Sequence, residues 1–224
     1  MKKPVIAIDG YSSTGKSSIS KIIADKLGLI HLDTGALYRG VTWFALQNCT
    51  DEAGSIDLNK LFSSLDQIDL EFKNQDGELI LFLNDTDISK QIRTNEVSDN
   101  VSLVAKQKEV RDFLLQSQRN LAEKGGIIMD GRDIGTVVLP NAEFKFFLTA
   151  SIDERTKRRY QELLSLGIEA VEQQVKENLV ERDKIDSERE IAPLRQAEDA
   201  IVIDNTNLTK RETIDAILSH IEKI

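Results

Sequence analysis

The sequence is poor in cysteine, in long apolar runs and in positive charge, and each shortage excludes a class of protein. Its only cysteine, Cys49, cannot form a disulfide within the chain, so we interpret it as a buried thiol with no sign of an oxidising compartment. No apolar run approaches the roughly 20 residues that span a bilayer. Residues 1–9 lack the long apolar segment and the cleavage site of a signal peptide. We therefore expect a cytoplasmic protein without a membrane partner.

Positive charge is scarce because 29 lysines and arginines stand against 38 aspartates and glutamates, which leaves a net charge of -9. This balance argues against a protein that coats DNA or RNA through its phosphates. A single nucleotide remains a possible ligand, since a local cluster of arginines can override the global sign. The 224 residues, 40% apolar and 30% charged, predict one soluble core with insertions, and nothing demands more than a monomer.

Short apolar runs alternate with helical segments along the chain. Residues 4–9 form a continuous apolar run before a glycine, as expected of a strand buried on both faces of a parallel sheet. Similar runs lie at residues 29–32, 126–129, 144–148 and 200–203, and helical spacing marks residues 17–27, 36–47 and 209–221. Five strands with helical crossovers predict an α/β fold, a doubly wound five-stranded parallel sheet with helices on both faces.

Residues 68–88 depart from this pattern. Apolar and polar residues alternate there in DLEFK and ELILFL, on either side of a turn that contains Asp76 and Gly77. Such alternation is typical of an antiparallel hairpin. Helices are predicted on either side, at about residues 58–65 and 97–123. The sequence therefore predicts a small antiparallel β subdomain inserted into the α/β domain.

Residues 10–17 read GYSSTGKS, a full match to the phosphate-binding pattern G-x-x-x-x-G-K-[ST], between a predicted strand and a predicted helix. In such a P-loop, backbone N–H groups and the helix N-terminus hold a polyphosphate. We expect Lys16 to reach the β and γ oxygens and Ser17 to ligate Mg²⁺. The predicted nucleotide-binding residues of this segment are Gly10, Tyr11, Ser12, Ser13, Thr14, Gly15, Lys16, Ser17 and Ser18.

A P-loop by itself indicates only that a nucleoside triphosphate is bound. A GTPase would read guanine with Asn-Lys-x-Asp after a late strand, whereas residues 204–207 read DNTN, without the lysine and the final aspartate. A small-molecule kinase needs a second anionic pocket, and arginines suit it because they bind phosphate bidentately. The arginines at the ends of predicted elements are Arg39, Arg111, Arg132, Arg182 and Arg189.

Four further motifs follow the P-loop. They are LDTGALYRG at residues 32–40, EVSDNVSLVAKQKEVR at 96–111, DGRDIGTVVLP at 130–140 and RD-x-x-D-x-x-R-x-x-APL at 182–194. Together with the P-loop they cover nearly the whole chain, which resembles the bacterial cytidylate kinases among the P-loop kinases for nucleoside monophosphates. Adenylate and shikimate kinases share the loop and lack the combination of DGRD with RD-x-x-D-x-x-R. The predicted hairpin is similar to the insertion of the long bacterial form.

The resemblance implies an enzyme of pyrimidine metabolism that transfers the γ-phosphoryl group of ATP to CMP or dCMP and requires Mg²⁺. It implies one P-loop kinase domain over residues 1–224, with an NMP-binding region at about 33–123, an antiparallel insert at about 66–90 and a lid at about 151–190. Two alternatives are a kinase for another nucleoside monophosphate and a P-loop regulator that binds a nucleoside triphosphate without any acceptor.

The resemblance also implies roles for individual residues. The acceptor phosphate would be held by Arg39, Arg132 and Arg189. The cytosine ring would face Thr34, Arg111 and Asp133, and the sugar would contact Ser102, Arg182 and Asp186. The residues expected to be catalytic are Lys16, Arg132, Arg189 and Asp130. The family often has serine where this chain has Thr34, and the hydroxyl group survives that change.

The chemistry of cytosine supports the role of Asp133. An ionised carboxylate only accepts hydrogen bonds, and cytosine offers an amino group where uracil has a carbonyl group. Uracil would leave a buried acceptor unpaired, a loss of roughly 1 to 3 kcal/mol, so we expect CMP to be preferred to UMP. A helix or turn cap is the plainer interpretation of Asp133.

Two aspartates are candidates for orienting the hydration shell of Mg²⁺. Asp130 ends an apolar strand, as the acidic residue of many P-loop enzymes does, and Asp33 ends the second predicted strand. The sequence leaves both open. Neither has to be a strong base, because phosphoryl transfer is helped mainly by alignment and charge neutralisation.

Residues 151–167 open with Ser151, a suitable N-cap, and carry several arginines along one helix. We expect this segment to form a lid that closes over ATP and excludes water, with Arg155 and Arg158 among the ATP-binding residues. A solvated helix with i,i+4 pairs, such as Glu154 with Arg158, is the alternative.

Overall fold

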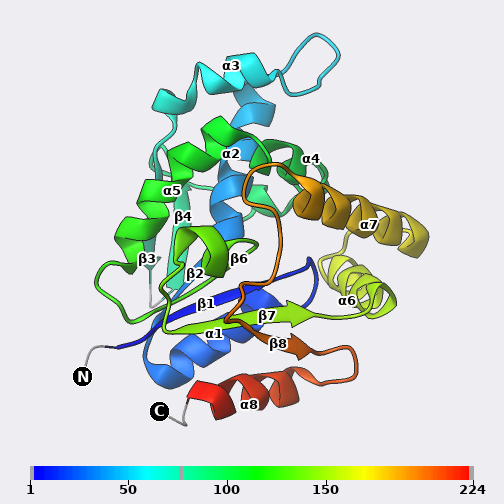
Figure 1. Cartoon of the computed structure of the whole chain (residues 1–224). Helices are drawn as coiled ribbons and strands as arrows, with labels where there is room; N and C mark the ends of the chain where they lie inside the picture. The colour runs from blue at the N-terminus through cyan, green and yellow to red at the C-terminus, as the bar shows by residue number, and fades with distance from the viewer. Residues whose placement is uncertain (1–2, 76–77, 222–224) are drawn as a thin grey trace. The chain divides into compact units, whose positions relative to one another are not determined.

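The computed structural model describes residues 3–75 and 78–221, and the chain divides into two compact units (Figure 1). Unit 1 consists of Met1–Leu32 and Leu121–Ile224, and unit 2 consists of Asp33–Asn120. Unit 2 is therefore one continuous stretch of chain. Unit 1 is assembled from the two stretches that precede and follow it.

A five-stranded parallel sheet forms the centre of unit 1, in the order β2-β6-β1-β7-β8. Its strands are β1 (Val5–Gly10), β2 (Ile30–Asp33), β6 (Ile127–Gly131), β7 (Phe144–Thr149) and β8 (Ile201–Asp204). The central strand β1 pairs with β6 on one side and β7 on the other, and its residues Ile6, Ala7 and Ile8 are buried and apolar. The predicted parallel sheet is confirmed.

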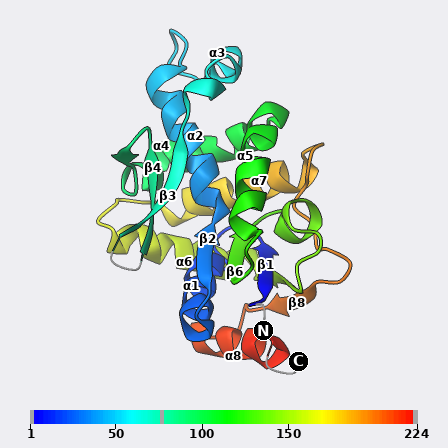
Figure 2. The same cartoon turned by 90° about the vertical axis from the view of Figure 1, so that its left-hand side faces the viewer.

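Two helices, α1 (Lys16–Leu27) and α8 (Lys210–Ile221), pack together against this sheet (Figures 1 and 2). Ile19 and Ile23 of α1 and Ile217 of α8 are buried in the same core, as their helical spacing predicts. Helix α1 ends at Gly28, whose φ of 63° lies in the left-handed region that glycine adopts without strain.

The segment predicted as a lid contains two helices, α6 (Ile152–Ser165) and α7 (Glu172–Glu188), which pack against each other. Their shared apolar seam contains Leu163, Val175 and Leu179. The predicted N-cap is confirmed, because Ser151 Oγ accepts a hydrogen bond from the backbone N–H of Glu154 at 3.3 Å.

A three-stranded antiparallel sheet in unit 2 has the order β3-β4-β5. Its strands are β3 (Leu70–Gln75), β4 (Glu78–Leu83) and β5 (Thr86–Asp87). The predicted antiparallel pairing is confirmed, with Phe72 opposite Leu81. The predicted turn at Asp76 and Gly77 lies outside the described residues. Strand β5 was not predicted, because two residues are too few to show alternation.

Four helices and two short 3₁₀ turns complete the described part of unit 2. They are α2 (Thr34–Asn48), α3 (Leu58–Phe62), η1 (Leu65–Gln67), η2 (Gln91–Arg93), α4 (Asn95–Ala105) and α5 (Lys108–Ala122). Helix α2 lies close to the antiparallel sheet, since a Cβ atom on Gly40 would lie 2.8 Å from Leu70 Cδ2. The unit has its own apolar core, which includes Val41, Leu81 and Val104.

The single helix predicted over residues 97–123 is wrong, because the chain forms α4 and α5 with a break at Lys106 and Gln107. The side chain of Gln107 donates to the carbonyl of Leu103 at 2.9 Å, while its backbone N–H donates to Val104. Both bonds satisfy carbonyls at the end of α4. Apolar spacing continues across the break, and no glycine or proline marks it, so the sequence carried no signal for it.

Candidate active site

The P-loop at residues 10–17 connects β1 to α1, and its two defining glycines are required by geometry. Gly10 has a φ of 147°, and a Cβ atom there would lie 2.0 Å from the carbonyl oxygen of Leu148 in β7. Gly15, with a φ of 87°, is the N-cap of α1. Ser13 also has a positive φ, 60°, which strains a residue with a Cβ atom.

Lys16 folds back over this loop and is buried. Its Nζ donates to the carbonyl oxygen of Tyr11 at 2.5 Å and lies 3.4 Å from Thr14 Oγ1, which donates to the same carbonyl. Its positive charge is therefore held at the loop, beside backbone groups that suit a polyphosphate.

Asp130, at the end of β6, joins the loop to β2. Ser17 Oγ donates to Asp130 Oδ2 at 2.7 Å, and His31 Nε2 lies 2.6 Å from Asp130 Oδ1. Asp33 has a different environment: it caps α2 and forms an ion pair with Arg39 at 2.7 Å. Of the two candidate metal-orienting aspartates, Asp130 is the one that contacts the P-loop serine.

The oxygen donors of Ser17 and Asp130 suit Mg²⁺, which prefers hard oxygen ligands and is held in nucleotide sites by few protein groups together with phosphates and water. Within residues 3–75 and 78–221, no group of three or more histidines, cysteines, aspartates or glutamates is placed to hold a metal. The oxygen donors of Ser17 and Asp130 fit a magnesium ion that is held mainly by a nucleotide and water.

A network of buried charges connects the DGRD motif with the C-terminal end of α7. Arg132 Nε donates to Asp186 Oδ2 at 3.0 Å, and Arg189 lies 3.6 Å from Asp133 and 3.9 Å from Asp186. Burial alone would raise the pKa of Asp186, but the charges of three arginines, including Arg182, lower it below its ordinary value. Two anionic and several cationic groups thus face one another in unit 1.

Asp9, at the end of β1, holds the loop that follows this motif. Its two carboxylate oxygens accept hydrogen bonds from the backbone N–H groups of Ile134 and Gly135 at 2.8 and 2.7 Å. These residues begin the short π-helix η3 (Ile134–Val138), directly after Asp133. Burial raises the pKa of Asp9 to about 7, although both backbone donors oppose this shift. Sequence reasoning missed this residue.

Two arginines of α6 have different partners: Arg155 contacts the P-loop and α7, whereas Arg158 contacts Asn205, which follows β8. Arg155 forms an ion pair with Asp183 at 2.6 Å and donates to the carbonyl oxygen of Ser12 at 3.4 Å. Arg158 donates to the side chain and the carbonyl of Asn205, at 3.0 and 2.8 Å. Asn205 in turn donates to the carbonyl of Thr14 at 2.9 Å. The predicted pair of Glu154 with Arg158 is also present.

The remaining predicted site residues lie in unit 2. Thr34 begins α2, Ser102 lies on α4 and Arg111 on α5, and all three are buried. The guanidinium of Arg111 lies over the ring of Tyr38, 5.2 Å from its centroid, and donates to the carbonyl of Ala105. Unit 2 thus supplies two hydroxyl groups and two arginines, counting Arg39.

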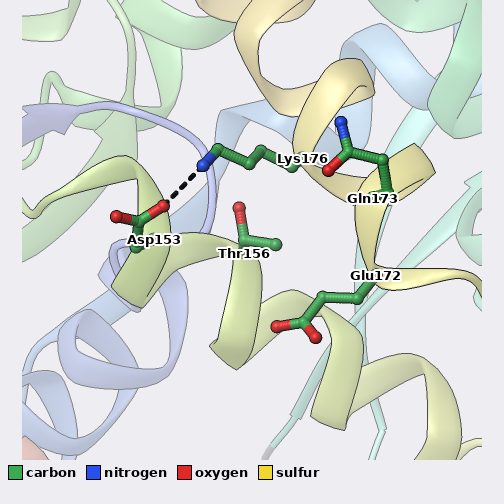
Figure 3. A pocket seen from close by; sticks show the side chains of 5 residues that line it. All are labelled: Asp153, Thr156, Glu172, Gln173 and Lys176. Carbon is green, nitrogen blue, oxygen red and sulfur yellow. Dashed lines mark hydrogen bonds and ion pairs between the residues drawn. The ribbon is translucent and has the colours of Figure 1, made fainter.

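A pocket of about 320 Å³ lies between α6 and α7 (Figure 3). Its walls are Asp153, Thr156, Glu172, Gln173 and Lys176. The ammonium of Lys176 pairs with Asp153 at 2.7 Å across it. None of the predicted site residues lines this pocket, so it is separate from the P-loop chemistry.

Asp183 and Asn205 were also missed as functional candidates. Asn205 follows β8, in the segment 204–207 that lacks the guanine-binding motif of GTPases. Nothing in the sequence indicated that Asn205 contacts the P-loop. Asp183 belongs to the RD-x-x-D-x-x-R motif, in which Arg182 and Asp186 had been given roles and Asp183 had none. Its position inside that motif was the available signal.

Comparison with known proteins places this chain among named relatives. A protein-family profile described as "Cytidylate kinase" matches residues 6–223. A cytidylate kinase of Bacillus subtilis (strain 168) is 48% identical over 223 residues, which cover 99% of this chain and 98% of the relative. A cytidylate kinase of Streptococcus pneumoniae (strain 70585) is 47% identical over 224 residues, 100% and 99% of the two chains.

A crystal structure of an uncharacterized protein from Eubacterium ventriosum ATCC 27560 resembles the fold, with a TM-score of 0.53 and 12% identity over the whole of both chains. This likeness concerns the fold alone. In the part of the chain that the structure describes, every helix is too short or too polar to cross a bilayer.

Proposed function

This chain belongs to the cytidylate kinase family, and we propose that it transfers the γ-phosphoryl group of ATP to CMP and dCMP, giving ADP with CDP or dCDP. The observation that carries this proposal is the match to that family over residues 6–223, with the P-loop, DGRD and RD-x-x-D-x-x-R motifs at their expected places. The reaction belongs to pyrimidine nucleotide metabolism.

On the ATP side, the backbone N–H groups of residues 10–18 and the Nζ of Lys16 hold the polyphosphate. Arg155 and Arg158 belong to the same side, since both are connected to carbonyl groups of the loop. Ser17 would ligate Mg²⁺, and Asp130 would orient its hydration shell. The Ser17–Asp130 hydrogen bond favours Asp130 over Asp33 for this role. When bound, the ion neutralises charge on the β and γ oxygens.

On the acceptor side, Arg132, Arg189 and Arg39 bind the phosphate of CMP. Asp133 accepts a hydrogen bond from the cytosine amino group, with Arg111 and Thr34 facing the same ring. The sugar contacts Arg182, Asp186 and Ser102. The ion pairs of Arg132 with Asp186 and of Arg189 with both Asp186 and Asp133 support this assignment. Both guanidinium groups are thereby connected through Asp186, and Arg189 also contacts the base-reading carboxylate.

The transfer needs alignment more than it needs a base. An oxygen of the CMP phosphate, already anionic, forms the new bond to the γ-phosphorus while the bond to the bridging oxygen of ADP breaks. Negative charge on the transferred group is neutralised by Lys16, Arg132 and Arg189, which makes these residues, with Asp130, the catalytic set. A lid at about residues 151–190 excludes water from the γ-phosphorus.

The proposed organisation is a single P-loop kinase domain over residues 1–224 that acts as a cytoplasmic monomer without nucleic acid. Unit 2 corresponds to most of the NMP-binding region at about 33–123, and its antiparallel sheet to the insert at about 66–90. The buried hydroxyl and guanidinium groups of unit 2 support a nucleotide-binding role for it.

The test is a coupled assay of ADP release from Mg-ATP with CMP, dCMP, UMP, AMP and GMP in parallel. We expect the highest kcat/KM with CMP and dCMP. A preference for another monophosphate would reassign the acceptor. Slow ADP release that no monophosphate stimulates would contradict the kinase function and favour a nucleotide-binding regulator.

A further inference from the structure

Asp183, on α7, has no part in the catalytic scheme, yet it forms one of the most buried ion pairs of the described residues. Its Oδ2 lies 2.6 Å from Arg155 Nη1, and only 16% and 7% of the two side chains are exposed. Burial raises the pKa of Asp183, although the charge of Arg155 opposes this. A carboxylate buried in this way is strongly destabilising unless its partner stays in place, so the contact is geometrically demanding.

Arg155 extends this contact to the P-loop. The same Nη1 donates to the carbonyl of Ser12 at 3.4 Å, and the guanidinium carbon lies 5.1 Å from the centroid of the Tyr11 ring. Nε donates to the carbonyl of Ala150, before α6. One guanidinium group therefore connects α7, the start of α6 and the middle of the P-loop, all within unit 1.

The same helix, α7, also contacts the proposed acceptor side of the site through Asp186. Asp186 lies three residues after Asp183, on the same face of α7, and holds Arg132 at 3.0 Å. One face of a single helix thus carries a carboxylate tied to the ATP-binding loop and a carboxylate tied to the phosphate-binding DGRD motif. A helix is a stiff element, so a shift at one carboxylate moves the other.

We propose that Asp183 is a positioning residue that couples the two substrate sites, because its ion pair with Arg155 fixes the acceptor-binding end of α7 to the P-loop. This inference rests on the proposed function for the identity of the two substrates. According to this proposal, a nucleotide bound at the P-loop fixes the positions of Arg155 and Asp183. Because Asp186 lies on the same helix, Asp186 and Arg132 are then also held in position to bind CMP. The affinities for the two ligands are therefore linked, and the linkage is reciprocal.

The experiment measures the Kd of CMP by calorimetry, with and without saturating Mg-AMP-PNP, in the wild type and in Asp183→Asn. The ratio of the two Kd values is the coupling factor. We expect CMP to bind at least 5-fold more tightly to the wild type when AMP-PNP is present, a typical coupling. In Asp183→Asn the ratio should fall to within 2-fold of one, while CMP alone binds within about 2-fold of the wild type.

The matched control is Asp153→Asn, which removes a second ion pair between α6 and α7. Asp153 and Lys176 are 2.7 Å apart, but 79% and 41% of their side chains are exposed (Figure 3). This variant should keep the wild-type coupling factor. Asp183→Glu, which retains the charge, should recover part of the coupling lost in Asp183→Asn, whereas a purely space-filling role would gain nothing from it.

If Asp183→Asn does not fold, the double variant Arg155→Gln with Asp183→Asn replaces it, because removing both charges leaves no uncompensated buried charge. Arg155 is itself an expected ATP-binding residue, so the Kd of Mg-AMP-PNP is measured first for this variant and the nucleotide is raised to saturation before the coupling factor is compared. A wild-type factor near one, or an unchanged factor in the folded variant, overturns the inference. ADP release from the wild type, assayed alongside, separates this failure from that of the kinase function: a wild type that releases ADP in response to CMP keeps its function even if the coupling is absent.

Discussion

Asp133 and Asp9 are both buried carboxylates, and Asp9 holds the backbone that directly follows Asp133. The groups that surround the two carboxylates differ. Asp133 lies 3.6 Å from the guanidinium of Arg189. Asp9 faces two backbone N–H groups and has the charge of Lys16 near it. The arginine beside Asp133 is itself a proposed ligand-binding residue, whereas the two backbone hydrogen bonds of Asp9 fix the position of the loop at Ile134 and Gly135. The two residues therefore call for different tests.

Asp133→Asn should relax the discrimination between CMP and UMP. The amide can donate a hydrogen bond to the uracil carbonyl, whereas the carboxylate leaves that carbonyl facing another acceptor. Since an unpaired buried acceptor costs roughly 1 to 3 kcal/mol, the ratio of kcat/KM for CMP over UMP should fall by about 5- to 150-fold. Asp85→Asn, at an exposed carboxylate, is the control. An unchanged ratio would remove Asp133 from base recognition.

The backbone geometry of the P-loop was predictable at this scale because its signal is local. Two glycines, a lysine and a serine within eight residues define the loop, and Gly10 and Gly15 occupy left-handed or close-packed positions as that pattern requires. The supporting residues were not predictable. Asp9 contacts Ile134, 125 positions away, and Asn205 contacts Thr14, 191 positions away. Such partners are set by the strand order, which no short motif encodes.

Asp9 also gives the stability of the protein a specific pH dependence. Its pKa is about 7 when folded and 3.8 ordinarily, so the folded state binds this proton more tightly. Its contribution to the free energy of unfolding is therefore largest below pH 4 and falls as the pH rises towards 7, by at most about 1.4 kcal/mol per pH unit. Above pH 7 it changes no further.

Urea unfolding of the wild type and of Asp9→Asn between pH 4 and 8 measures this effect, since the amide does not titrate. We expect the stability difference between the two proteins to shrink with rising pH up to about 7. Asp204→Asn is the control, because hydrogen bonds from Thr206 lower the pKa of Asp204 and its contribution is constant over this range. A constant difference for Asp9→Asn would mean that Asp9 is ionised throughout.

Among the elements, the antiparallel sheet and α2 depend on each other. Leu81 of β4 is fully buried in the core of unit 2, and Gly40 lets α2 approach Leu70 closely. A short antiparallel sheet is marginal by itself and is stabilised by packing against a helix. The alternating pattern predicted this sheet. The break between α4 and α5, where the side chain and the backbone N–H of Gln107 both donate to carbonyl groups of α4, was not predicted.

Leu81→Ala should destabilise unit 2 by about 2 to 5 kcal/mol, because it leaves a cavity in a packed core. Trp43, the only tryptophan of the chain, packs against this core from α2. Its fluorescence during urea unfolding therefore reports on unit 2 specifically. Leu164→Ala, at a half-exposed position on α6, should change the midpoint very little. Equal midpoints for the two variants would contradict the packing role of Leu81.

At the scale of the whole molecule, some of the proposed nucleotide-binding residues belong to unit 1 and others to unit 2. The P-loop lies wholly in unit 1, whereas Thr34, Arg39, Ser102 and Arg111 lie in unit 2. The hairpin pattern predicted only the antiparallel insert at about residues 66–90. The wider NMP-binding region at about 33–123 came from the family resemblance and stays a prediction. The contacts of Arg155 with Ser12 and Asp183, which connect α6 with the P-loop and α7, could not be predicted from the sequence and are known only from the structure.

Hydrogen exchange with each ligand alone tests this division. Mg-AMP-PNP should slow the exchange of amides in residues 10–18 by at least about 10-fold, since the loop N–H groups bind phosphate. CMP should slow exchange around residues 34–39 and 102–111. Protection of residues 34–39 by Mg-AMP-PNP to the same degree as by CMP would argue against an NMP-binding role for unit 2.

The strand order also has a consequence for synthesis on the ribosome. The central strand β1 is made first, but its neighbours β6 and β7 emerge only after residues 127 and 144. After β1 and before β6, the continuous stretch Asp33–Asn120 leaves the exit tunnel. This stretch has its own core and can fold while β1 has no partner strand. The apolar segment VIAI of β1 is therefore without its partner strands until more than half of the chain has been made.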